Sequence, residues 1–264
     1  MTGVQRPPLP RWCNLIRADN PSPMTLEGTN TYVLRAPGAR DAVVVDPGPL
    51  DEAHLEAVAA HRPVVLVLLT HGHPDHSDGA RRLHEMTGAP VVAADPAFCI
   101  GADPWSPDDA GESVAGLQIT VLPTPGHTSD SVCLVVTDNG DEPEDPGLLT
   151  GDTILGRGTT VVAHPDGRLG DYLSSLRKLE SLRDLGALTL LPGHGPAGGD
   201  AGERATAYLL HRAQRLDQVR RALSGGATTA HDVVRRVYAD VDESLWSAAE
   251  LSVLAQLDYL ADHP

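Results

Sequence analysis

The sequence predicts an α/β fold followed by a small helical region. From about residue 29, short apolar runs alternate with turns and helical stretches, a pattern that indicates strands and helices in alternation. After the Gly-rich stretch 192–202 the apolar runs stop, and only helical patterns follow. We therefore expect two domains, residues 1–200 and 201–264. The expected strands are 30–34, 42–46, 64–69, 90–94, 117–122, 132–136 and 148–150.

The clearest helix of the first domain spans residues 171–186. Leucine recurs every three residues along it, at Leu173, Leu176, Leu179 and Leu182. This spacing is typical of an amphipathic helix, with Asp171 as the expected N-cap and Gly186 as the expected C-cap. The acidic, Pro-rich stretch 137–147 is expected to form a surface hairpin.

Three helical patterns make up the second domain, over residues 204–223, 230–238 and 244–261. Gly225 and Gly226 supply a turn between the first two, and Thr229 supplies a helix cap. The domain is too small to be catalytic by itself. We expect it either to cover one side of a cleft or to mediate a homodimer.

Composition fits a globular protein with few aromatic residues. The chain has 264 residues, of which 41% are hydrophobic, enough to bury one sizeable core and a small appendage. Its three cysteines, Cys13, Cys99 and Cys133, show no C-x-x-C spacing and indicate a reduced, intracellular protein. No apolar run approaches the roughly 20 residues of a membrane span, and the N-terminus has no apolar signal region. We expect a cytoplasmic protein with no membrane partner.

The net charge of −16 counts against nonspecific binding of a polyanion, which depends on Lys and Arg. Arginines are nevertheless frequent between residues 204 and 236. Arg212, Arg215 and Arg220 cannot all share one narrow stripe of a helix with 3.6 residues per turn. A solvated helix with ion pairs and a phosphate-binding face both remain open.

The segment THGHPDHSDG, residues 70–79, indicates a metal site. His71, His73, Asp75 and His76 place four potential zinc ligands on one short turn. In an extended segment, residues two apart point the same way, so the first two histidines can share one ion while the other donors serve a second. The alternative is a polar surface loop.

Two zinc shells of about four or five ligands each need further donors. His127, Asp152 and His194 each lie just past a strand-like run, between small or turn-forming residues. Such positions place side chains at the edge of a sheet, where sites are commonly built.

This ordered set of motifs, together with Asp46 in VVVDPG, resembles the metallo-β-lactamase-fold hydrolases. The resemblance implies an αββα sandwich with two metal sites, in which Asp46 supports the ligands. The implied ligands are His71, His73 and His127 for one ion, Asp75, His76 and His194 for the other, and Asp152 bridging both. Two Zn²⁺ ions are favoured because di-iron members carry a glutamate at the position of His73, although Mn²⁺ or mixed occupancy remains open.

Flanking segments 20–34, 123–136 and 208–219 resemble the lactamase-beta-2-like branch of this superfamily. Members of that branch append a small winged-helix-like domain, and the animal mitochondrial member is an endoribonuclease for single-stranded RNA. The resemblance covers nearly the whole chain. Substrates vary widely within the superfamily, so fold and metal site transfer more directly than substrate does.

The resemblance implies a dinuclear metal-dependent hydrolase that uses a metal-bound hydroxide. Zinc lowers the pKa of bound water to about 7, and the hydroxide can attack a carbonyl carbon or a phosphorus atom. Asp75 or Asp152 would act in catalysis by orienting this nucleophile. The first expectation is a phosphodiesterase or endoribonuclease acting on single-stranded RNA. The alternatives are a hydrolase of small esters, thioesters or lactones, similar to glyoxalase II, and a non-catalytic metal-bound scaffold.

Three further residues are candidates for substrate binding. Asn30 and Thr31 are expected either to line the pocket floor or to stabilise a turn with their side chains. His211, on the first appended helix, is expected either to contact a substrate oxygen or to pack at the domain junction.

Overall fold

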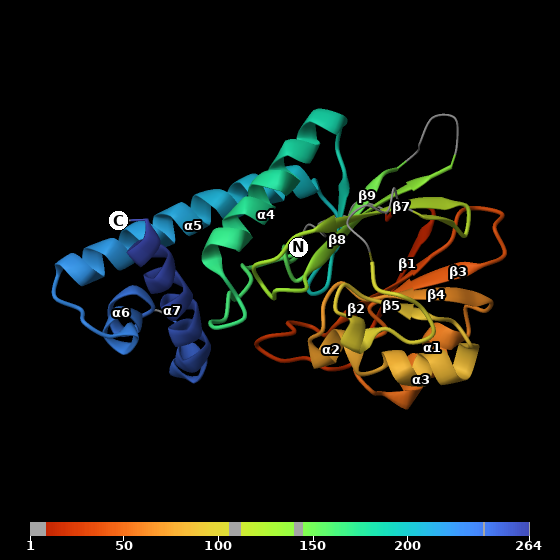
Figure 1. The fold of residues 1–264 in the computed structure, drawn as a ribbon, viewed down its shortest axis with the longest axis horizontal. Helices are drawn as coiled ribbons and strands as arrows, with labels where there is room; N and C mark the ends of the chain where they lie inside the picture. The colour runs from red at the N-terminus through yellow and green to blue at the C-terminus, as the bar shows by residue number, and fades with distance from the viewer. Residues whose placement is uncertain (1–8, 106–111, 140–144, 240, 264) are drawn as a thin grey trace, which may run out of the picture.

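The computed structural model describes residues 9–105, 112–139, 145–239 and 241–263. Two 5-stranded sheets, ordered β1-β2-β3-β4-β5 and β10-β9-β8-β7-β6, form the centre of the molecule, and helices cover their outer sides (Figure 1). The predicted α/β class and the αββα layering are therefore confirmed. None of the described helices has both the length and the apolar character needed to cross a membrane.

The first sheet has an antiparallel half and a parallel half. Its strands are β1 (Cys13–Arg17), β2 (Asn30–Leu34), β3 (Ala42–Val45), β4 (Val64–Leu68) and β5 (Val91–Val92). Strands β1 to β3 pair antiparallel, and β3 to β5 pair parallel. The parallel pairs need crossovers, which the helices between them supply. These helices are α1 (Glu52–Ala59), α2 (Pro74–Ser77) and α3 (Ala80–Thr87), and a 3₁₀ turn, η1 (Pro96–Phe98), follows β5.

The second sheet is antiparallel except at one edge. Its strands are β6 (Glu112–Val114), β7 (Leu117–Pro123), β8 (Val132–Asp138), β9 (Gly147–Gly151) and β10 (Thr189–Pro192). Only β9 and β10 pair parallel, and α4 (Leu169–Ser181) lies between them in the chain. Strands β8 and β9 pair antiparallel, as the hairpin prediction for 137–147 requires, but its residues 140–144 lie outside the described residues.

Alternating side chains along the strands build the cores on either side of each sheet. In β3, Val43 and Val45 belong to the core between the two sheets, whereas Ala42 and Val44 pack with Leu55 of α1 on the outer side. This two-residue period is what a strand buried on both faces provides. Each of the expected strands overlaps an observed one, while β1 and β6 were not expected.

Helix α4 begins earlier than predicted. Its N-cap residue is Arg168, and Asp171 lies within the first turn. The predicted N-cap was therefore wrong. Leu169 is only 2% exposed and belongs to the same core as the later leucines, so burial extends the helix toward its N-terminus. The C-cap residue of α4 is Leu182 rather than the predicted Gly186, which instead ends the following 3₁₀ turn, η2 (Leu182–Leu185).

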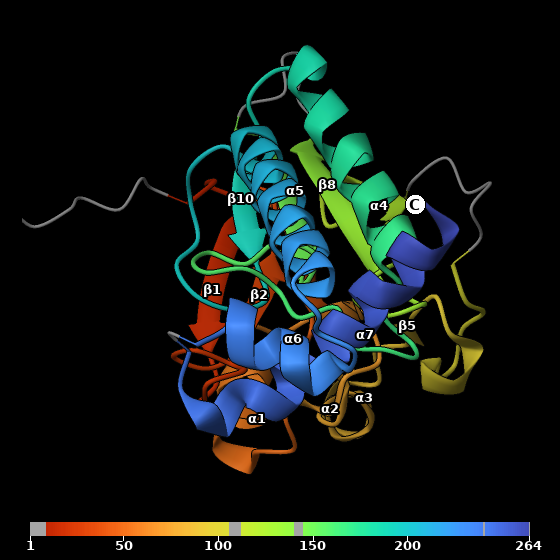
Figure 2. The same ribbon diagram turned by 90° about the vertical axis from the view of Figure 1, so that its left-hand side faces the viewer.

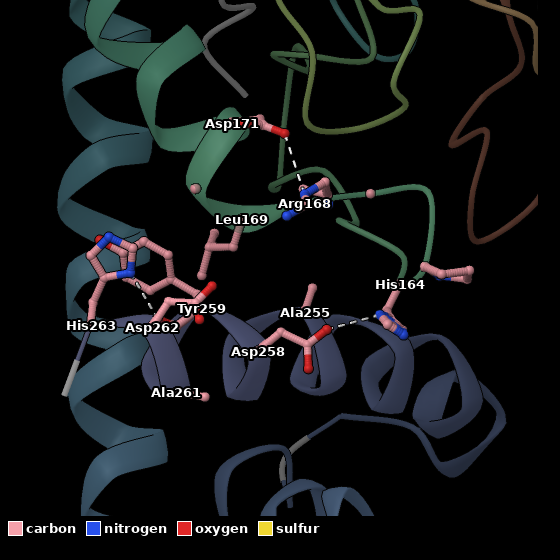
Figure 3. Close-up of a pocket in the computed structure, with 13 residues that line it drawn as sticks. His164, Arg168, Leu169, Asp171, Ala255, Asp258, Tyr259, Ala261, Asp262 and His263 are labelled. Atoms are coloured by element: carbon pink, nitrogen blue, oxygen red, sulfur yellow. Dashed lines mark hydrogen bonds and ion pairs between the residues drawn. The ribbon is translucent and has the colours of Figure 1, made fainter.

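The three predicted C-terminal helices are confirmed. They are α5 (Ala201–Ser224), α6 (Ala230–Val237) and α7 (Trp246–Asp262), with a 3₁₀ turn, η3 (Glu243–Leu245), before the last. Figure 2 shows α5 running beside α4, with α6 and α7 near its far end. A hollow of about 590 Å³ separates the start of α4 from α7 (Figure 3).

Helix α5 contributes to two cores. Ala201, Ala205 and Tyr208 pack in the core that contains α4. Val219 and Ala222, farther along the same helix, pack with α6 and α7. The domain boundary after residue 200 stays a prediction.

Candidate metal centre and adjoining cavity

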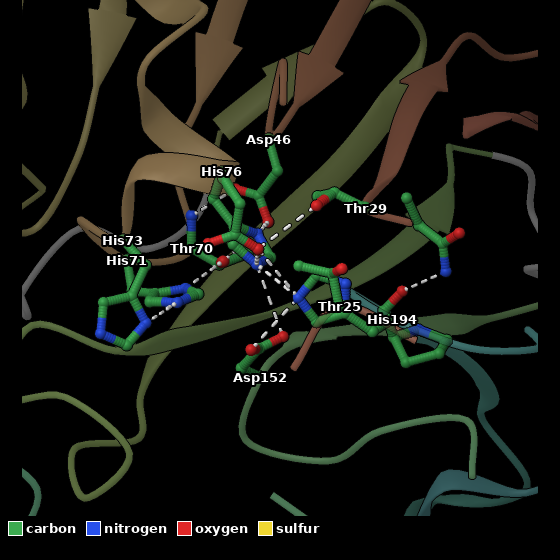
Figure 4. A network of polar contacts seen from close by, with 12 residues as sticks. Thr25, Thr29, Asp46, Thr70, His71, His73, His76, Asp152 and His194 are labelled. Atoms are coloured by element: carbon green, nitrogen blue, oxygen red, sulfur yellow. Dashed lines mark hydrogen bonds and ion pairs between the residues drawn. The ribbon is translucent and has the colours of Figure 1, made fainter. Parts of the chain in front are cut away.

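The seven predicted metal ligands lie together where several strands end. The motif of residues 70–79 follows β4, His127 lies between β7 and β8, Asp152 follows β9, and His194 follows β10. Figure 4 shows the ligands from β4, β9 and β10 pointing toward one another. Among the described residues, three overlapping groups have ligand atoms within 4.8 Å of one another, namely His71, His73 and His127; His71, His76 and Asp152; and Asp75, His76 and His194.

In the first group, three imidazole nitrogens converge. His73 Nδ1 lies 3.0 Å from His71 Nε2 and 3.1 Å from His127 Nε2. Two ligand atoms about 2.1 Å from a tetrahedral zinc ion would lie roughly 3.4 Å apart. The three nitrogens are therefore spaced closely enough to share one cation.

The second group combines imidazole and carboxylate donors. His194 Nε2 lies 3.2 Å from His76 Nε2 and 3.1 Å from Asp75 Oδ2. Asp152 Oδ2 lies 3.4 Å from His194 Nε2 and 3.7 Å from His127 Nε2, so this carboxylate lies between the two groups. Asp152 Oδ1 is buried and accepts no hydrogen bond from the described residues, although His76 Nε2 lies 3.5 Å away. A buried carboxylate oxygen without a donor is costly, and a cation at this point would remove that cost.

Asp46 and Thr70 contact the Nδ1 atoms of His76 and His71, respectively. Asp46 Oδ1 accepts a hydrogen bond from Thr70 N at 2.8 Å, and Asp46 Oδ2 accepts one from Thr70 Oγ1 at 2.7 Å. The same Asp46 Oδ2 lies 2.8 Å from His76 Nδ1, and Thr70 Oγ1 lies 3.0 Å from His71 Nδ1. With a proton on each Nδ1, both Nε2 atoms are free for a metal. Sequence reasoning missed Thr70, although it directly precedes His71.

Backbone carbonyls hold two more of the five histidines, His127 and His194. His127 Nδ1 lies 2.8 Å from the carbonyl oxygen of Val161, and His194 Nδ1 lies 3.3 Å from that of Gly28. These contacts again favour a proton on Nδ1 and leave Nε2 unprotonated. No residue type signals a carbonyl acceptor, so the sequence could not reveal these partners.

The charges of the second group depend on one another. Burial alone would lower the pKa of His194, but contacts with Asp152 and Asp75 raise it to about 9. Burial likewise opposes the charge of His76, yet Asp46 and Asp152 raise its pKa well above the usual range. Burial would raise the pKa of Asp75, but the hydrogen bond with His194 and the charge of His76 lower it to about 2. In the absence of metal, the positive charges of protonated His76 and His194 therefore offset the negative charges of the neighbouring carboxylates.

In the first group, by contrast, the pKa values of two histidines are lowered. Burial, followed by the charge of His76, lowers the pKa of His71 well below its ordinary value. Burial also lowers the pKa of His127. Both imidazoles are therefore neutral at neutral pH, which is the form that binds a metal.

Gly193 makes room for this arrangement. A Cβ atom at this position would lie 2.7 Å from Asp152 Oδ1 and 2.7 Å from His76 Cε1. Any side chain would displace one of the two ligands. Sequence reasoning missed this residue, although it directly precedes His194.

The structure does not place Asn30 and Thr31 at the pocket floor. Both are buried in β2. Asn30 Nδ2 donates to the carbonyl oxygens of Pro192 and Gly195, each at 2.9 Å, and Thr31 Oγ1 donates to that of Asp46 at 2.6 Å. These side chains hold the loops that carry ligands, so the prediction that they contact substrate is corrected. The pairing register of β2 with its neighbouring strands determines the direction of these side chains, and the residue types alone do not reveal it.

A cavity extends from the metal ligands to the C-terminal helices. A part of about 80 Å³ is bounded by His127 and Asp152. A second part of about 270 Å³ is lined by His211 of α5, by residues of α7, by Tyr238 and Val241 before η3 and by Leu245 of η3. The two parts share Pro23, Met24 and the loop 159–161. The expectation that the C-terminal helices cover one side of a cleft agrees with this lining.

Comparison with known proteins assigns a family. A family model described as "Metallo-beta-lactamase superfamily" matches residues 24–194, and one described as "Beta-lactamase associated winged helix domain" matches residues 229–263. A Caenorhabditis elegans protein named "Beta-lactamase-like protein 2 homolog" is 32% identical over 237 residues, which cover 85% of this chain and 76% of that relative.

Two further proteins show the same similarity. An Aspergillus fumigatus protein named "Atrochrysone carboxyl ACP thioesterase" is 29% identical over 266 residues, covering 90% of this chain and 78% of the relative. The crystal structure of a metallo-beta-lactamase family protein from Thermus thermophilus has the same fold, with a TM-score of 0.74 at 24% identity, covering 96% of this chain and 94% of that one. The chain therefore belongs to the metallo-beta-lactamase superfamily of metal-dependent hydrolases, and a beta-lactamase-associated winged-helix domain follows its sandwich.

Proposed function

We propose that the protein hydrolyses an acyl thioester at a two-metal centre. One observation carries the proposal: seven donor side chains converge beside a small cavity bounded by His127 and Asp152, which adjoins a larger, partly apolar one. The relative from Aspergillus fumigatus that is named a thioesterase adds support. The sequence-based expectation gave RNA as the first substrate candidate and thioesters as an alternative, and the proposal reverses that order.

The donor set suits two zinc ions, with Mn²⁺ or mixed occupancy as the alternatives. His71, His73 and His127 would hold one ion. Asp75, His76 and His194 would hold the other, with Asp152 between them. When bound, the ions would lower the pKa of a coordinated water to about 7 and polarise the scissile carbonyl.

Asp75 and Asp152 would orient the attacking water. Burial opposes ionisation of Asp152, but His76 and His194 lower its pKa well below the ordinary value. The pKa of Asp75 is also lowered, to about 2. Both carboxylates are therefore ionised at neutral pH and can accept a hydrogen bond from the nucleophile.

The size and lining of the cavity favour an acyl chain over a polynucleotide. Met24, Val161 and Leu245 give the part of about 270 Å³ apolar walls, which suit methylene groups. Single-stranded RNA is normally bound along a basic groove that neutralises several phosphates. A net charge of −16 opposes such binding, and Arg220 on α5 pairs with Asp217 at 3.2 Å.

A phosphodiesterase acting on single-stranded RNA is the second candidate. The winged-helix match over residues 229–263 favours it, because such folds bind nucleic acids in other proteins. The resemblance to the lactamase-beta-2-like branch points the same way. The metal chemistry would serve a phosphorus centre as well as a carbonyl carbon.

Zinc-loaded protein should be assayed with acyl N-acetylcysteamine thioesters, S-lactoylglutathione and an oligoribonucleotide. We expect thioester turnover that falls by about 10²- to 10⁴-fold in Asp152→Ala and His76→Ala. His263→Ala changes an exposed histidine outside the centre and should match the wild type. If the oligoribonucleotide is cleaved and the thioesters are not, the second candidate is established instead. Full metal content with neither substrate cleaved would favour a scaffold.

A further inference from the structure

The larger part of the cavity collects positive charge in an acidic protein. His211, Arg212 and Arg215 of α5 line it, and no Asp or Glu is among its lining residues. The whole chain carries a net charge of −16. Cationic groups that face a confined, partly apolar space focus the field on whatever enters it.

Arg212 is a buried cation with an unused donor. Its side chain is part of a residue only 4% exposed. One terminal nitrogen donates to the carbonyl oxygen of Thr160, and the guanidinium carbon lies 5.0 Å from the centroid of the Tyr172 ring. Arg212 Nε is buried and has no hydrogen-bond partner among the residues that the structure describes. Within the described part of the chain, no carboxylate pairs with Arg212, and a buried cation left unpaired is costly.

His211 and Arg215 extend this surface along the helix. They are four residues apart and so share one face of α5. His211 Nδ1 is buried, and no described residue forms a hydrogen bond with it. Burial, followed by the charges of Arg212 and Arg215, lowers the pKa of His211, so the neutral ring can present an N–H group. Arg215 Nη1 donates to the carbonyl oxygen of Val237 at 3.0 Å, and no described carboxylate pairs with Arg215.

The hollow between α4 and α7 differs from this cavity because basic groups that line it pair with carboxylates (Figure 3). There Arg168 Nε lies 3.6 Å from Asp171 Oδ2, and His164 Nδ1 lies 3.2 Å from Asp258 Oδ2. These two basic groups already have acidic neighbours. The buried donors of His211 and Arg212, in contrast, belong to residues that line the cavity near the metal ligands.

The loop 159–161 joins this cationic surface to the metal ligands. Val161 accepts the hydrogen bond from His127 Nδ1, and Thr160 Oγ1 donates to the carbonyl oxygen of Asp152 at 2.5 Å. Arg212 binds the same loop from the other side. A chain that runs along this loop would therefore have one end at the metal ligands and the other at the arginines.

We propose that the cavity binds the terminal carboxylate of an acyl chain whose thioester lies at the metal centre. The inference rests on the proposed function and names its substrate class, the thioesters of dicarboxylic acids. The carboxylate accepts hydrogen bonds from Arg212 Nε, from His211 Nδ1 and from the Arg215 guanidinium. The apolar walls enclose the methylene groups between the two ends.

The first test compares the glutaryl and pentanoyl thioesters of N-acetylcysteamine, which differ in the terminal carboxylate. The zinc-loaded wild type should have a kcat/KM roughly tenfold or more higher for the glutaryl thioester, as expected for charged hydrogen bonds. Arg215→Met and His211→Gln should each reduce this preference, mainly through KM. Arg220→Met changes an arginine of the same helix that is 48% exposed, and it should retain the preference. We choose these variants because substitution of Arg212 would also disturb the ligand-bearing loop.

The second test measures binding without catalysis, by calorimetry with glutarate, its uncharged diamide and acetate. Glutarate should bind the zinc-loaded wild type and Arg220→Met at least about tenfold more tightly than Arg215→Met. Acetate controls for a carboxylate that binds only the metal, and it should not distinguish these proteins. The diamide should bind none of them.

The outcomes separate this inference from the proposed function. If no thioester is hydrolysed but glutarate binding depends on Arg215, the function is wrong and the carboxylate site stands. Equal hydrolysis of both thioesters without glutarate binding would leave the function intact and overturn the site. Binding of inorganic phosphate or an oligoribonucleotide that depends on Arg215, without glutarate binding, would also overturn the carboxylate assignment and favour a phosphate.

Discussion

His76 Nδ1 lies 2.8 Å from Asp46 Oδ2, and both side chains are buried. Through this contact Asp46 determines which nitrogen of His76 faces the metal centre. Asp46 also accepts two hydrogen bonds from Thr70, so its carboxylate has only donors around it. An amide in its place would direct its NH₂ group at one of them.

Asp46→Asn should therefore lower zinc affinity by about 10- to 100-fold, as substitutions of such outer partners commonly do. Asn tolerates the left-handed backbone of this position, where φ is 51°, so the fold should persist. Competition with a zinc chelator measures the affinity, and circular dichroism checks the fold. Asp41→Asn, at an exposed position before β3, is the control. Equal zinc affinity in both variants would contradict this role of Asp46.

Gly193→Ala should remove metal without unfolding the protein. The new Cβ would meet Asp152 Oδ1 and His76 Cε1 at 2.7 Å, distances at which one ligand must move. We expect less than one zinc ion per site by elemental analysis, with thermal unfolding still cooperative. Gly170→Ala is the matched control, since its Cβ would meet only Tyr259 at 3.6 Å and Ala is favoured over Gly within a helix. Full zinc occupancy in Gly193→Ala would refute the steric argument.

The sequence predicted that these seven side chains would meet because the segments that carry them follow apolar strands. Strands β4, β9 and β10 each end within a few residues of a ligand, and apolar runs are easily recognised. The geometry brings all seven predicted ligands together. What could not be predicted were the carbonyl partners at Gly28 and Val161, because every residue carries a carbonyl group.

The errors arose where tertiary packing overrides a local pattern. Asp171 is a favourable N-cap residue, but the burial of Leu169 starts α4 earlier. Asn30 and Thr31 are common in turns, yet they lie in β2 and bind backbone carbonyls. In each case the deciding contact is with a residue distant in sequence or with the core, so it leaves no local signal.

Metal binding should release protons. In the metal-free protein the pKa of His194 is raised to about 9 and that of His76 is also raised, so both carry protons at pH 7 that coordination must displace. We expect about one to two protons released for each protein molecule that takes up its zinc at pH 7. Zinc affinity should therefore fall as pH falls below about 9, by up to roughly tenfold per pH unit for each proton displaced.

Calorimetry in buffers that differ in ionisation enthalpy measures this release, and chelator competition between pH 6 and pH 8 measures the slope. His194→Gln should release fewer protons than the wild type. Zinc affinity that does not change over this pH range would show that neither histidine is protonated before the metal binds.

The capping box of α6 offers a test of how far the C-terminal helices unfold on their own. Thr229 Oγ1 accepts a hydrogen bond from Asp232 N at 3.1 Å, and Asp232 Oδ2 accepts one from Thr229 N at 3.0 Å. Thr229→Ala should cost about 1 kcal/mol of helix stability. Hydrogen exchange should then become faster in α6 and α7, which share a core, while zinc content stays unchanged. Thr228→Ala removes a hydroxyl that donates only to the Asp232 side chain and binds no backbone N–H group of the helix, and it should have a smaller effect.

The capping box of α6 also predicts that the protection of this helix against hydrogen exchange depends on pH. Hydrogen bonds from Thr229 and Thr228 lower the pKa of Asp232 to about 2, below the value of about 3.9 for an unfolded chain. A carboxyl group whose pKa is lower in the folded state stabilises the fold above its unfolded pKa, and it loses this contribution as pH falls toward the folded value. Protection of α6 against exchange, measured as the ratio of the intrinsic to the observed exchange rate at each pH, should therefore fall between about pH 4 and pH 2 in the wild type, and less so in Asp232→Asn. Faster exchange throughout the sandwich at the same pH would mean that the C-terminal helices and the sheets unfold together, because α5 packs in both cores.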